Sequence, residues 1–379
     1  MLLTEIIAWG SLYERFQGYP LFIQIALVVI VLSVSLFLLG NAGLALERYE
    51  TTYRETKTKE ASTLVMDELV GNLVLDESVT ETEFNSFVGR VGELSNKSRI
   101  FNQVVIDQII FYHRNFTDST DRIVKRLFSR LNLIESALRK IKSSAWELKA
   151  KGLREMQEMH PEEQFDNLVE PLLNDENDDL RVEAQATFLS LHTNNPFDFL
   201  ASATEELLPW HQILLYDIIV NNPDIPVPDL NKFLQSKNAS VVSFAIKLTD
   251  HYNQMETVPQ LITLLDHSDL HIRMEAIKVL GKLNAEEAEP VMIDKYAEEN
   301  IKVKINILES VGNIRSGYNI AFLKEQFLEA EEFALIKTAG CALAIYPEFH
   351  KEEFVNDAHT ISPQRETIIN HCTNTLIRN

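Results

Sequence analysis

Two patterns of apolar and polar residues divide this chain of 379 residues. The first is a continuous run from Leu21 to Leu39 that contains no charged residue. The second is a pair of short amphipathic segments separated by a polar turn, seen most clearly from Leu261 to Asn284. In that stretch one apolar helix is expected to end at Asp266, and a second helix, which carries Ala276 and Leu280, begins after the turn.

The second pattern recurs along the C-terminal part of the chain at a nearly constant period of 30 or 31 residues. Each copy has one reference position. The residue before it is apolar, and the third residue after it is mostly small or apolar. One helix pair cannot bury its own apolar face, so a constant period with core positions in constant phase predicts stacked pairs. The chain is therefore expected to be all-α, with an α-solenoid as its main part. The reference positions of the repeats are Arg181, His211, Val242, Arg273, Lys304 and Leu335.

The unit resembles a HEAT repeat. A leucine-rich helix end closing on Asp266 is followed by Ile272-Arg273-x-x-Ala276, and the copy at Leu180-Arg181-x-x-Ala184 repeats this arrangement. The copies at Val241 and Val303 are weaker, and the one around His211 departs from the pattern. The resemblance covers about residues 145–379. It implies the architecture and a surface for a protein partner, without identifying that partner.

The resemblance also implies contacts between neighbouring repeats. Basic side chains recur four residues after Asn or Asp in three copies, and in HEAT-like arrays such positions form a hydrogen-bond ladder. The basic residues are Arg181, Arg273 and Lys304, which follow Asn177, Asp269 and Asn300.

In solenoids of this kind the second helices usually line the concave side. Positions two, five and nine after the reference residue avoid the core phase in the better copies, so we expect a partner to bind there. These positions supply the candidate partner-binding residues Glu183, Tyr216, Lys247, His251, Glu275, Lys278, Lys282, Asn306, Glu309 and Asn313.

The run from Leu21 to Leu39 predicts a transmembrane anchor. Nineteen helical residues extend roughly 28 Å, about the thickness of the hydrocarbon core of a bilayer. A cleaved signal peptide is the alternative, because small residues follow at Gly40. Such a peptide has a basic leading region and a shorter apolar run, whereas Glu5 and Glu14 precede this long one, so retention is favoured.

Basic residues predict the orientation of this anchor. Arg15 is the only basic side chain on its N-terminal side, while Arg48, Arg54, Lys57 and Lys59 follow it. The positive-inside bias therefore places the N-terminus outside and the repeat array in the cytoplasm. The two cysteines, Cys341 and Cys372, are expected to be unpaired, which agrees with a reducing compartment.

Residues 1–19 have apolar and aromatic side chains at helical spacing and predict a short interfacial helix, with a disordered leader as the alternative. Residues 47–60 predict a solvated stalk that continues the membrane helix. Beyond the stalk, Thr80-x-x-Glu83 is a capping-box pattern. Ile100–Tyr112 is apolar on several faces but too short to span a membrane, so it predicts the buried helix of a small bundle; a re-entrant segment is the alternative.

Residues 122–154 are basic, with ten Lys and Arg against two acidic side chains. A solvated helix face is one interpretation, and contact with anionic lipid headgroups or an acidic partner is the other. The candidate membrane-surface residues are Arg122, Lys125, Arg126 and Arg130.

Charge and motifs narrow the possible functions. Residues 161–379 contain 36 Asp and Glu against 16 Lys and Arg, and so acidic an array repels the phosphates of nucleic acids. His267 and His271 are four apart, but they straddle a predicted turn and are not expected to bind a metal. The sequence has no phosphate-binding loop, nucleophile elbow or paired-cysteine metal motif. No cofactor or small-molecule ligand is predicted.

These observations predict four parts: an interfacial segment (1–19), a transmembrane anchor (20–46), a stalk with a membrane-proximal helical region (47–144) and a HEAT-like array (145–379). The leading hypothesis is a membrane-anchored cytoplasmic scaffold that binds a protein partner and organises or regulates a membrane complex, and not an enzyme. HEAT-like repeats also occur in lyases that attach bilin chromophores, which is the enzymatic alternative. A secreted or periplasmic binding protein is a third interpretation, which requires cleavage of the N-terminal segment.

Overall fold

The computed structural model describes residues 16–69, 80–115, 119–159, 165–192, 195–346 and 362–374, so most of the predicted interfacial helix lies outside the described residues. Every regular element among them is a helix, which confirms the all-α prediction. The chain forms two compact units, Met1–Ser136 and Ala137–Asn379. The short helix α6 (Ile134–Ile141) crosses the boundary between them.

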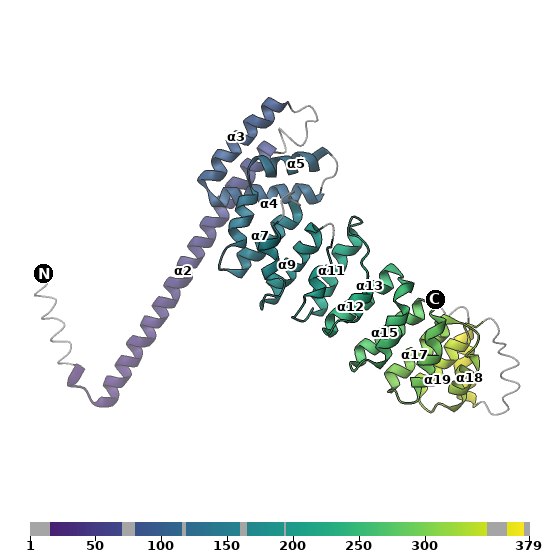
Figure 1. The fold of residues 1–379 in the computed structure, drawn as a ribbon. Helices are drawn as coiled ribbons and strands as arrows, with labels where there is room; N and C mark the ends of the chain where they lie inside the picture. The colour runs from purple at the N-terminus through teal and green to yellow at the C-terminus, as the bar shows by residue number, and fades with distance from the viewer. Residues whose placement is uncertain are drawn as a thin grey trace, which may run out of the picture. The chain divides into compact units, whose positions relative to one another are not determined.

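The first unit is built on a single long helix, α2 (Leu21–Leu69), drawn in purple in Figure 1. Its apolar N-terminal part is exposed along its whole length. Near its C-terminal end Ala61 and Val65 become buried, where α2 packs on α4. The predicted anchor and the predicted stalk therefore belong to one uninterrupted helix.

Two further predictions for this unit are confirmed. Thr80 and Glu83 form a complete capping box at the start of α3, with Thr80 N donating to Glu83 Oε2 at 2.9 Å. The apolar segment Ile100–Tyr112 lies in a helix that buries Val105, Ile106 and Ile109 within the unit. Helix α4 (Arg99–Asn115) packs on α2, and α3 (Glu81–Lys97) and α5 (Ser119–Arg130) pack on α4.

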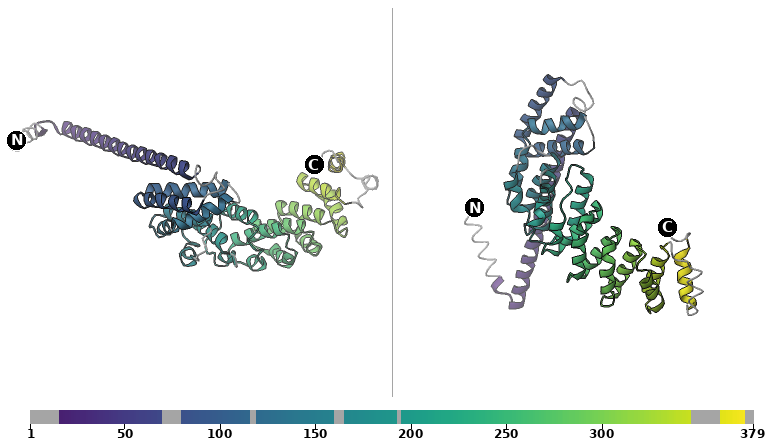
Figure 2. Two further views of the ribbon diagram at one scale, coloured as in Figure 1. Left: turned by 90° about the horizontal axis from the view of Figure 1, so that it is seen from above. Right: turned by 45° about the vertical axis from the view of Figure 1, so that its right-hand side comes forward.

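The second unit is the repeat array, in which helix pairs follow one another in chain order (Figures 1 and 2). The second helix of each pair is the longer one, and most second helices pack closely against a neighbouring second helix. These second helices are α9 (Asp178–Leu191), α11 (Pro209–Asn221), α13 (Ala239–Tyr252), α15 (Leu270–Lys282), α17 (Ile301–Ile314) and α19 (Phe333–Leu343).

The first helix of each pair is shorter and often begins or ends in a 3₁₀ turn. Helix α7 (Trp146–Met159) precedes these pairs, and α21 (Pro363–Thr373) follows the last of them. The first helices comprise α8 (Asp166–Val169) with η2 (Glu170–Leu172), α10 (Asp198–Ala201), α12 (Asn231–Leu234), η3 (Met255–Thr257) with α14 (Val258–Thr263) and η4 (Leu264–Asp266), η5 (Glu286–Ala288) with α16 (Glu289–Tyr296), and α18 (Ile320–Glu329).

The predicted phase of the repeats is confirmed in four copies. Each reference residue lies at the third or fourth position of a second helix. In the copies at Arg181, Val242, Arg273 and Lys304, the preceding residue and the third residue after it are both buried. The copies on α11 and α19 differ, because Trp210 and Ala334, which precede the reference residue, are exposed there.

Short polar side chains determine where most second helices begin. Each of these residues has extended backbone geometry, and its side chain accepts a hydrogen bond from an N–H of the first turn. Asn238 also donates through Nδ2 to the Glu205 carbonyl of the preceding repeat at 2.9 Å, so this cap also joins two repeats. The capping residues are Asn177, Asn238, Asp269 and Asn300.

Neighbouring second helices approach closely where glycines replace larger residues. Gly281 of α15 and Gly312 of α17 occupy equivalent positions 31 residues apart. A Cβ atom on Gly312 would lie 2.6 Å from Ala342 Cβ, and one on Gly281 would lie 2.7 Å from Ser310 Cβ. No side chain fits at either contact without moving a helix backbone.

The array ends on α21, which begins at Pro363 after the N-cap residue Ser362, as predicted. Ile369 of this helix is fully buried against the last pair. Arg365 donates through Nε and Nη2 to the carbonyls of Phe327 and Ala330 at 2.9 and 2.6 Å, and thereby satisfies the C-terminal end of α18.

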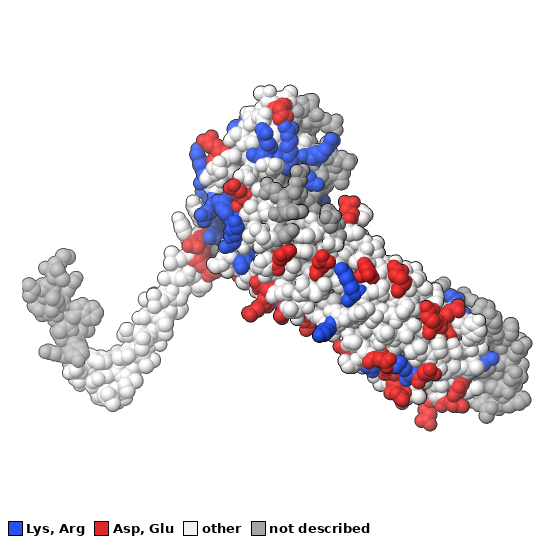
Figure 3. Space-filling view, in the orientation of Figure 1, with Lys and Arg blue, Asp and Glu red and all other residues white. Residues whose placement is uncertain are grey.

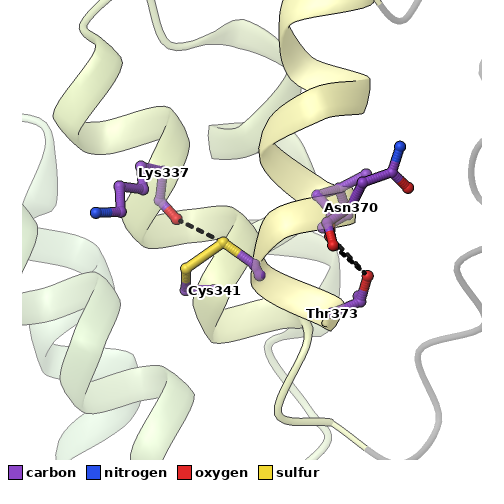
Figure 4. Close-up of a disulfide and its surroundings, with 6 residues drawn as sticks. Lys337, Cys341, Asn370 and Thr373 are labelled. Atoms are coloured by element: carbon purple, nitrogen blue, oxygen red, sulfur yellow. Dashed lines mark hydrogen bonds between the residues drawn. A yellow bond between two sulfur atoms is a disulfide. The ribbon is translucent and has the colours of Figure 1, made fainter. Parts of the chain in front are cut away.

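The expectation of two unpaired cysteines is wrong. Cys341 of α19 and Cys372 of α21 form a disulfide across a Cα–Cα distance of 4.8 Å (Figure 4). The two residues lie 31 positions apart, one repeat period, so that equivalent sites on adjacent helices face each other. The sequence argument for a reducing compartment therefore no longer holds.

The repeat phase can be tested at two positions of α15 that are two residues apart. Ala276 is fully buried between second helices, whereas Lys278 is exposed. Ala276→Asp buries a charge without a partner and should lower the free energy of unfolding by about 3 kcal/mol. Lys278→Glu should change it by less than about 0.5 kcal/mol. Thermal melts of the full-length chain followed by circular dichroism would compare the two, and equal losses would contradict the phase.

The close helix contact can be tested with a second matched pair. Gly312→Ala forces α17 and α19 apart and should destabilise the array by about 1–3 kcal/mol. Gly89→Ala, on α3 with no atom near its added methyl group, should stabilise by about 0.5–1 kcal/mol through helix propensity. Denaturant titrations measure both changes, and a tolerated Gly312→Ala would show that the helices are farther apart.

Candidate partner-binding surface

The predicted partner-binding residues, called the polar row from here on, lie on the five consecutive second helices from α9 to α17, and several of them contact a neighbouring repeat. On α11 and α13, the Tyr216 hydroxyl and His251 Nδ1 are 3.1 Å apart. Lys247 Nζ donates to Gln212 Oε1 at 2.7 Å across the same pair of helices. The row therefore holds repeats together as well as facing solvent.

The contacts continue from α13 to α15. Glu275 accepts a hydrogen bond from Ser243 Oγ at 2.6 Å and lies 3.7 Å from Lys247 Nζ. Lys282 forms an ion pair with Asp250 of the preceding helix. Lys278 is exposed between these contacts, so it is the lysine of this row most available to a partner.

The two ends of the row differ. Glu183 on α9 is mostly buried and pairs with Arg154 of α7, whereas Glu309 and Asn313 on α17 are exposed. Asn306 is only 4 % exposed, so its assignment to a solvent-facing surface is wrong. Neighbouring helices cover Asn306, because this turn of α17 is buried on more than one side.

The predicted ladder is present at two of its three positions. Arg181 Nη2 donates to the Glu206 carbonyl of the next repeat at 3.3 Å. Arg273 makes a bidentate contact with Glu299 of the next repeat, with distances of 2.9 and 3.1 Å. Lys304 instead lies over the ring of Tyr296, 5.2 Å from its centroid.

His211 takes the ladder position on α11 and is completely buried. Neither ring nitrogen has a hydrogen-bond partner. Desolvation, and after it the nearby positive charge of Arg181, lowers the pKa of His211 below its ordinary value. The imidazole is therefore held neutral inside the array.

Sequence reasoning missed the exposed apolar side chains of α11. Trp210, Ile213 and Val220 are 46 %, 71 % and 43 % exposed, while His211 and Gln212 are buried. Two features of the sequence could have indicated them. This copy departs from the repeat pattern, and α11 is apolar on nearly every side.

The two histidines of the α14–α15 turn do not converge. His267 Nδ1 accepts a hydrogen bond from Asp269 N at 3.0 Å, and His271 Nε2 lies 3.2 Å from Glu275 on the following turn. Among the residues that the structure describes, no group of three or more His, Cys, Asp or Glu side chains could hold a metal ion.

The candidate membrane-surface residues lie on α5. Arg126 forms an ion pair with Glu81 and stands 4.1 Å from the centroid of the Phe84 ring. Arg130 Nη2 donates to Asn85 Oδ1 at 2.7 Å. Arg122 and Lys125 are exposed as well, and Figure 3 shows basic side chains gathered over the helices of this unit. Contact with lipid stays a prediction for all four.

Taken by its geometry, the second unit is an α-solenoid of helix pairs with capped second helices and a ladder between repeats. A family profile described as HEAT repeats matches residues 227–312, from just before α12 into α17. Residues 227–312 therefore contain HEAT repeats. A search of curated proteins found no match.

Among solved structures, the chain is similar to the complex of CpcE and CpcF of phycocyanin lyase from Nostoc sp. PCC7120. The identity is 10 %, the TM-score is 0.24, and the alignment covers 72 % of this chain and 94 % of that one. With a TM-score this low, neither fold nor function is inferred from the similarity.

The buried His211 makes the stability of the array depend on pH. Its folded-state pKa is lowered, so its contribution is complete above the unfolded value of about 6.5 and is lost as the pH falls below it. The melting temperature should therefore drop between pH 7 and pH 5, and His211→Leu should reduce that drop. An unchanged pH dependence in the variant would show that His211 is not the group responsible.

Proposed function

We propose that this protein is a membrane-anchored scaffold whose HEAT array binds a protein partner and thereby organises or regulates a membrane complex. The observation that carries the proposal is the continuity of α2, which is an exposed apolar helix at one end and part of a folded unit at the other. A helix of this kind supports tethering of a folded domain to a bilayer. The repeat array supports binding, because HEAT repeats expose long surfaces to partners.

Length and composition support the anchor. The most apolar stretch of α2 has a mean hydropathy of 2.9 and no buried residue in the structure. No charged residue occurs between Leu21 and Leu46, and aromatic side chains stand at both ends, with Tyr19 before the run and Tyr49 after it. From Leu21 to Tyr49 the helix extends about 42 Å, close to the thickness of a bilayer with its headgroups. Aromatic residues at those depths are typical of membrane helices.

Two observations bear on the side of the membrane that the array occupies. The basic residues that follow the apolar run, from Arg48 to Lys59, favour the cytoplasm through the positive-inside bias. The disulfide between Cys341 and Cys372 favours an oxidising compartment outside it. We propose the cytoplasmic placement, since the basic residues lie next to the span itself. An array outside the cytoplasm is the second candidate, which the disulfide supports.

Reporter fusions test anchoring and orientation together. Fused after Asn379 of the full-length chain, a fluorescent protein that folds only in the cytoplasm should be active, and alkaline phosphatase should be inactive. The chain should fractionate with membranes and keep its N-terminal segment. Phosphatase activity would reverse the orientation, and a mature protein that begins near Gly43 would contradict the anchor.

Thiol trapping separates the two candidates independently. Cells are quenched with acid, free thiols are blocked, and a maleimide polymer is added before and after reduction. A cytoplasmic array should label before reduction, because the reducing pool keeps Cys341 and Cys372 as thiols. Labelling only after reduction would favour the array outside. Cys341→Ser with Cys372→Ser is the control that should not label.

A further inference from the structure

Helix α11 buries two polar side chains beside its core residues Leu215 and Ile219, and it exposes apolar side chains on another face. His211 and Gln212 are buried, whereas Trp210, Ile213 and Val220 are exposed. In the copies on α9, α13, α15 and α17 the residue equivalent to Trp210 is buried. The exposed residues share one face, because positions 210, 213, 217 and 220 fall within about 80° around a helix. We call Trp210, Ile213, Asp217 and Val220 the α11 stripe.

This orientation is specified by contacts on the buried side. Gln212 Nε2 donates to the Leu207 carbonyl at 2.9 Å, and Gln212 Oε1 accepts from Lys247. His211 is enclosed without a hydrogen bond, which costs stability. The array thus keeps two polar side chains inside while apolar side chains of the same helix face solvent. Such an arrangement is typical of a surface that a partner covers.

A carboxylate lies within the stripe. Asp217 is exposed, lies one turn after Ile213 and three residues before Val220, and accepts a hydrogen bond from Asn221 Nδ2 at 2.9 Å. A partner that covered the stripe with apolar groups alone would bury this carboxylate without a counter-charge, which is costly. The lysines on the neighbouring helix do not supply one here, because Lys247 contacts Gln212 and Glu275.

From this geometry we infer that the α11 stripe binds an amphipathic helix of a partner protein, with apolar side chains on one face and a Lys or Arg opposite Asp217. The inference rests on the proposed function, and it names the kind of partner and the residues that contact it. Apolar side chains spaced three or four residues apart match a stripe with the same spacing. The array carries a net charge of −20 over residues 161–379, which attracts a basic segment and accelerates its binding.

A second copy of the chain fits the stripe poorly. Two α11 helices related by a two-fold axis would place Asp217 against Ile213, or against Asp217 of the other copy, and neither alignment supplies a cation. The basic amphipathic helix of this chain, α5, already buries Val124 and Leu127 within its own unit. An anionic bilayer surface would repel Asp217.

Site-specific photo-crosslinking in cells tests the inference. Trp210 of the full-length chain is replaced by p-benzoylphenylalanine, and the crosslinked peptide is sequenced by mass spectrometry. The expected peptide forms a helix with apolar residues three or four apart and a Lys or Arg on the same face. Crosslinks to lipid, to this chain, to an acidic helix or to nothing would overturn the inference.

A second crosslinking position separates this inference from the proposed function. The same photo-reactive residue in place of Lys278 probes the polar row on α15. If Lys278 captures a protein and Trp210 does not, the scaffold proposal stands and the stripe is not its binding site. If neither position captures a protein, both fail.

Charge reversal with a matched control tests the role of Asp217. Asp217→Lys should reduce the Trp210 crosslink by at least about tenfold, and Lys or Arg→Glu in the captured helix should restore it. Asp294→Lys makes the same charge change at an exposed position of α16 and should have little effect. Melting temperatures show that both variants are folded. Equal effects of the two substitutions would mean that only the overall charge of the array matters, which would overturn the pairing with Asp217.

Discussion

The close packing of successive second helices is the constraint on which the array depends. Ala184, Ala245 and Ala276 are completely buried at equivalent positions, and glycines at positions 281 and 312 let helix backbones nearly touch. A helix pair on its own would leave this face in water, so each repeat is stable only beside its neighbours. The Asn and Asp caps then begin each second helix at the point where it can enter the stack. In addition to that packing, the ladder side chains Arg181 and Arg273 donate hydrogen bonds to the next repeat.

The architecture could be predicted from the sequence because the period is carried by buried residues. A polar side chain at Val241, Ile272 or Val303 would be buried without a hydrogen-bond partner, so these positions require apolar residues and their spacing reveals the repeat directly. The capping box at Thr80 and the cap at Ser362 could also be predicted, because these residue types accept hydrogen bonds from the backbone N–H groups at helix starts. The disulfide could not be predicted in this way, because the pairing of Cys341 with Cys372 depends on two helices being adjacent in space.

The candidate surface was harder to predict. The positions two, five and nine after the reference residue describe one face of an ideal helix, and Lys278 and Glu309 are indeed exposed there. Asn306 lies on a turn where neighbouring helices close over that face, which spacing within one helix cannot show. The α11 stripe was missed because a periodic pattern assigns polar residues to the outside. On α11 the contacts of Gln212 with the backbone and with Lys247 reverse that assignment.

The unbroken course of α2 couples the orientation of the first unit to that of the apolar run at the start of the same helix. Each residue of an α-helix advances the chain by 1.5 Å and turns it by about 100°. Ala61 and Val65, on which α4 packs, therefore face a direction set by the side of the helix that Leu21–Leu39 presents to its surroundings. A flexible linker would lose this relation, whereas one residue added to the stalk would swing the packed helices more than a quarter turn around the helix axis. In the proposed membrane-anchored arrangement, a neighbour that holds the span in one rotational setting also sets the direction in which everything packed on Val65 faces.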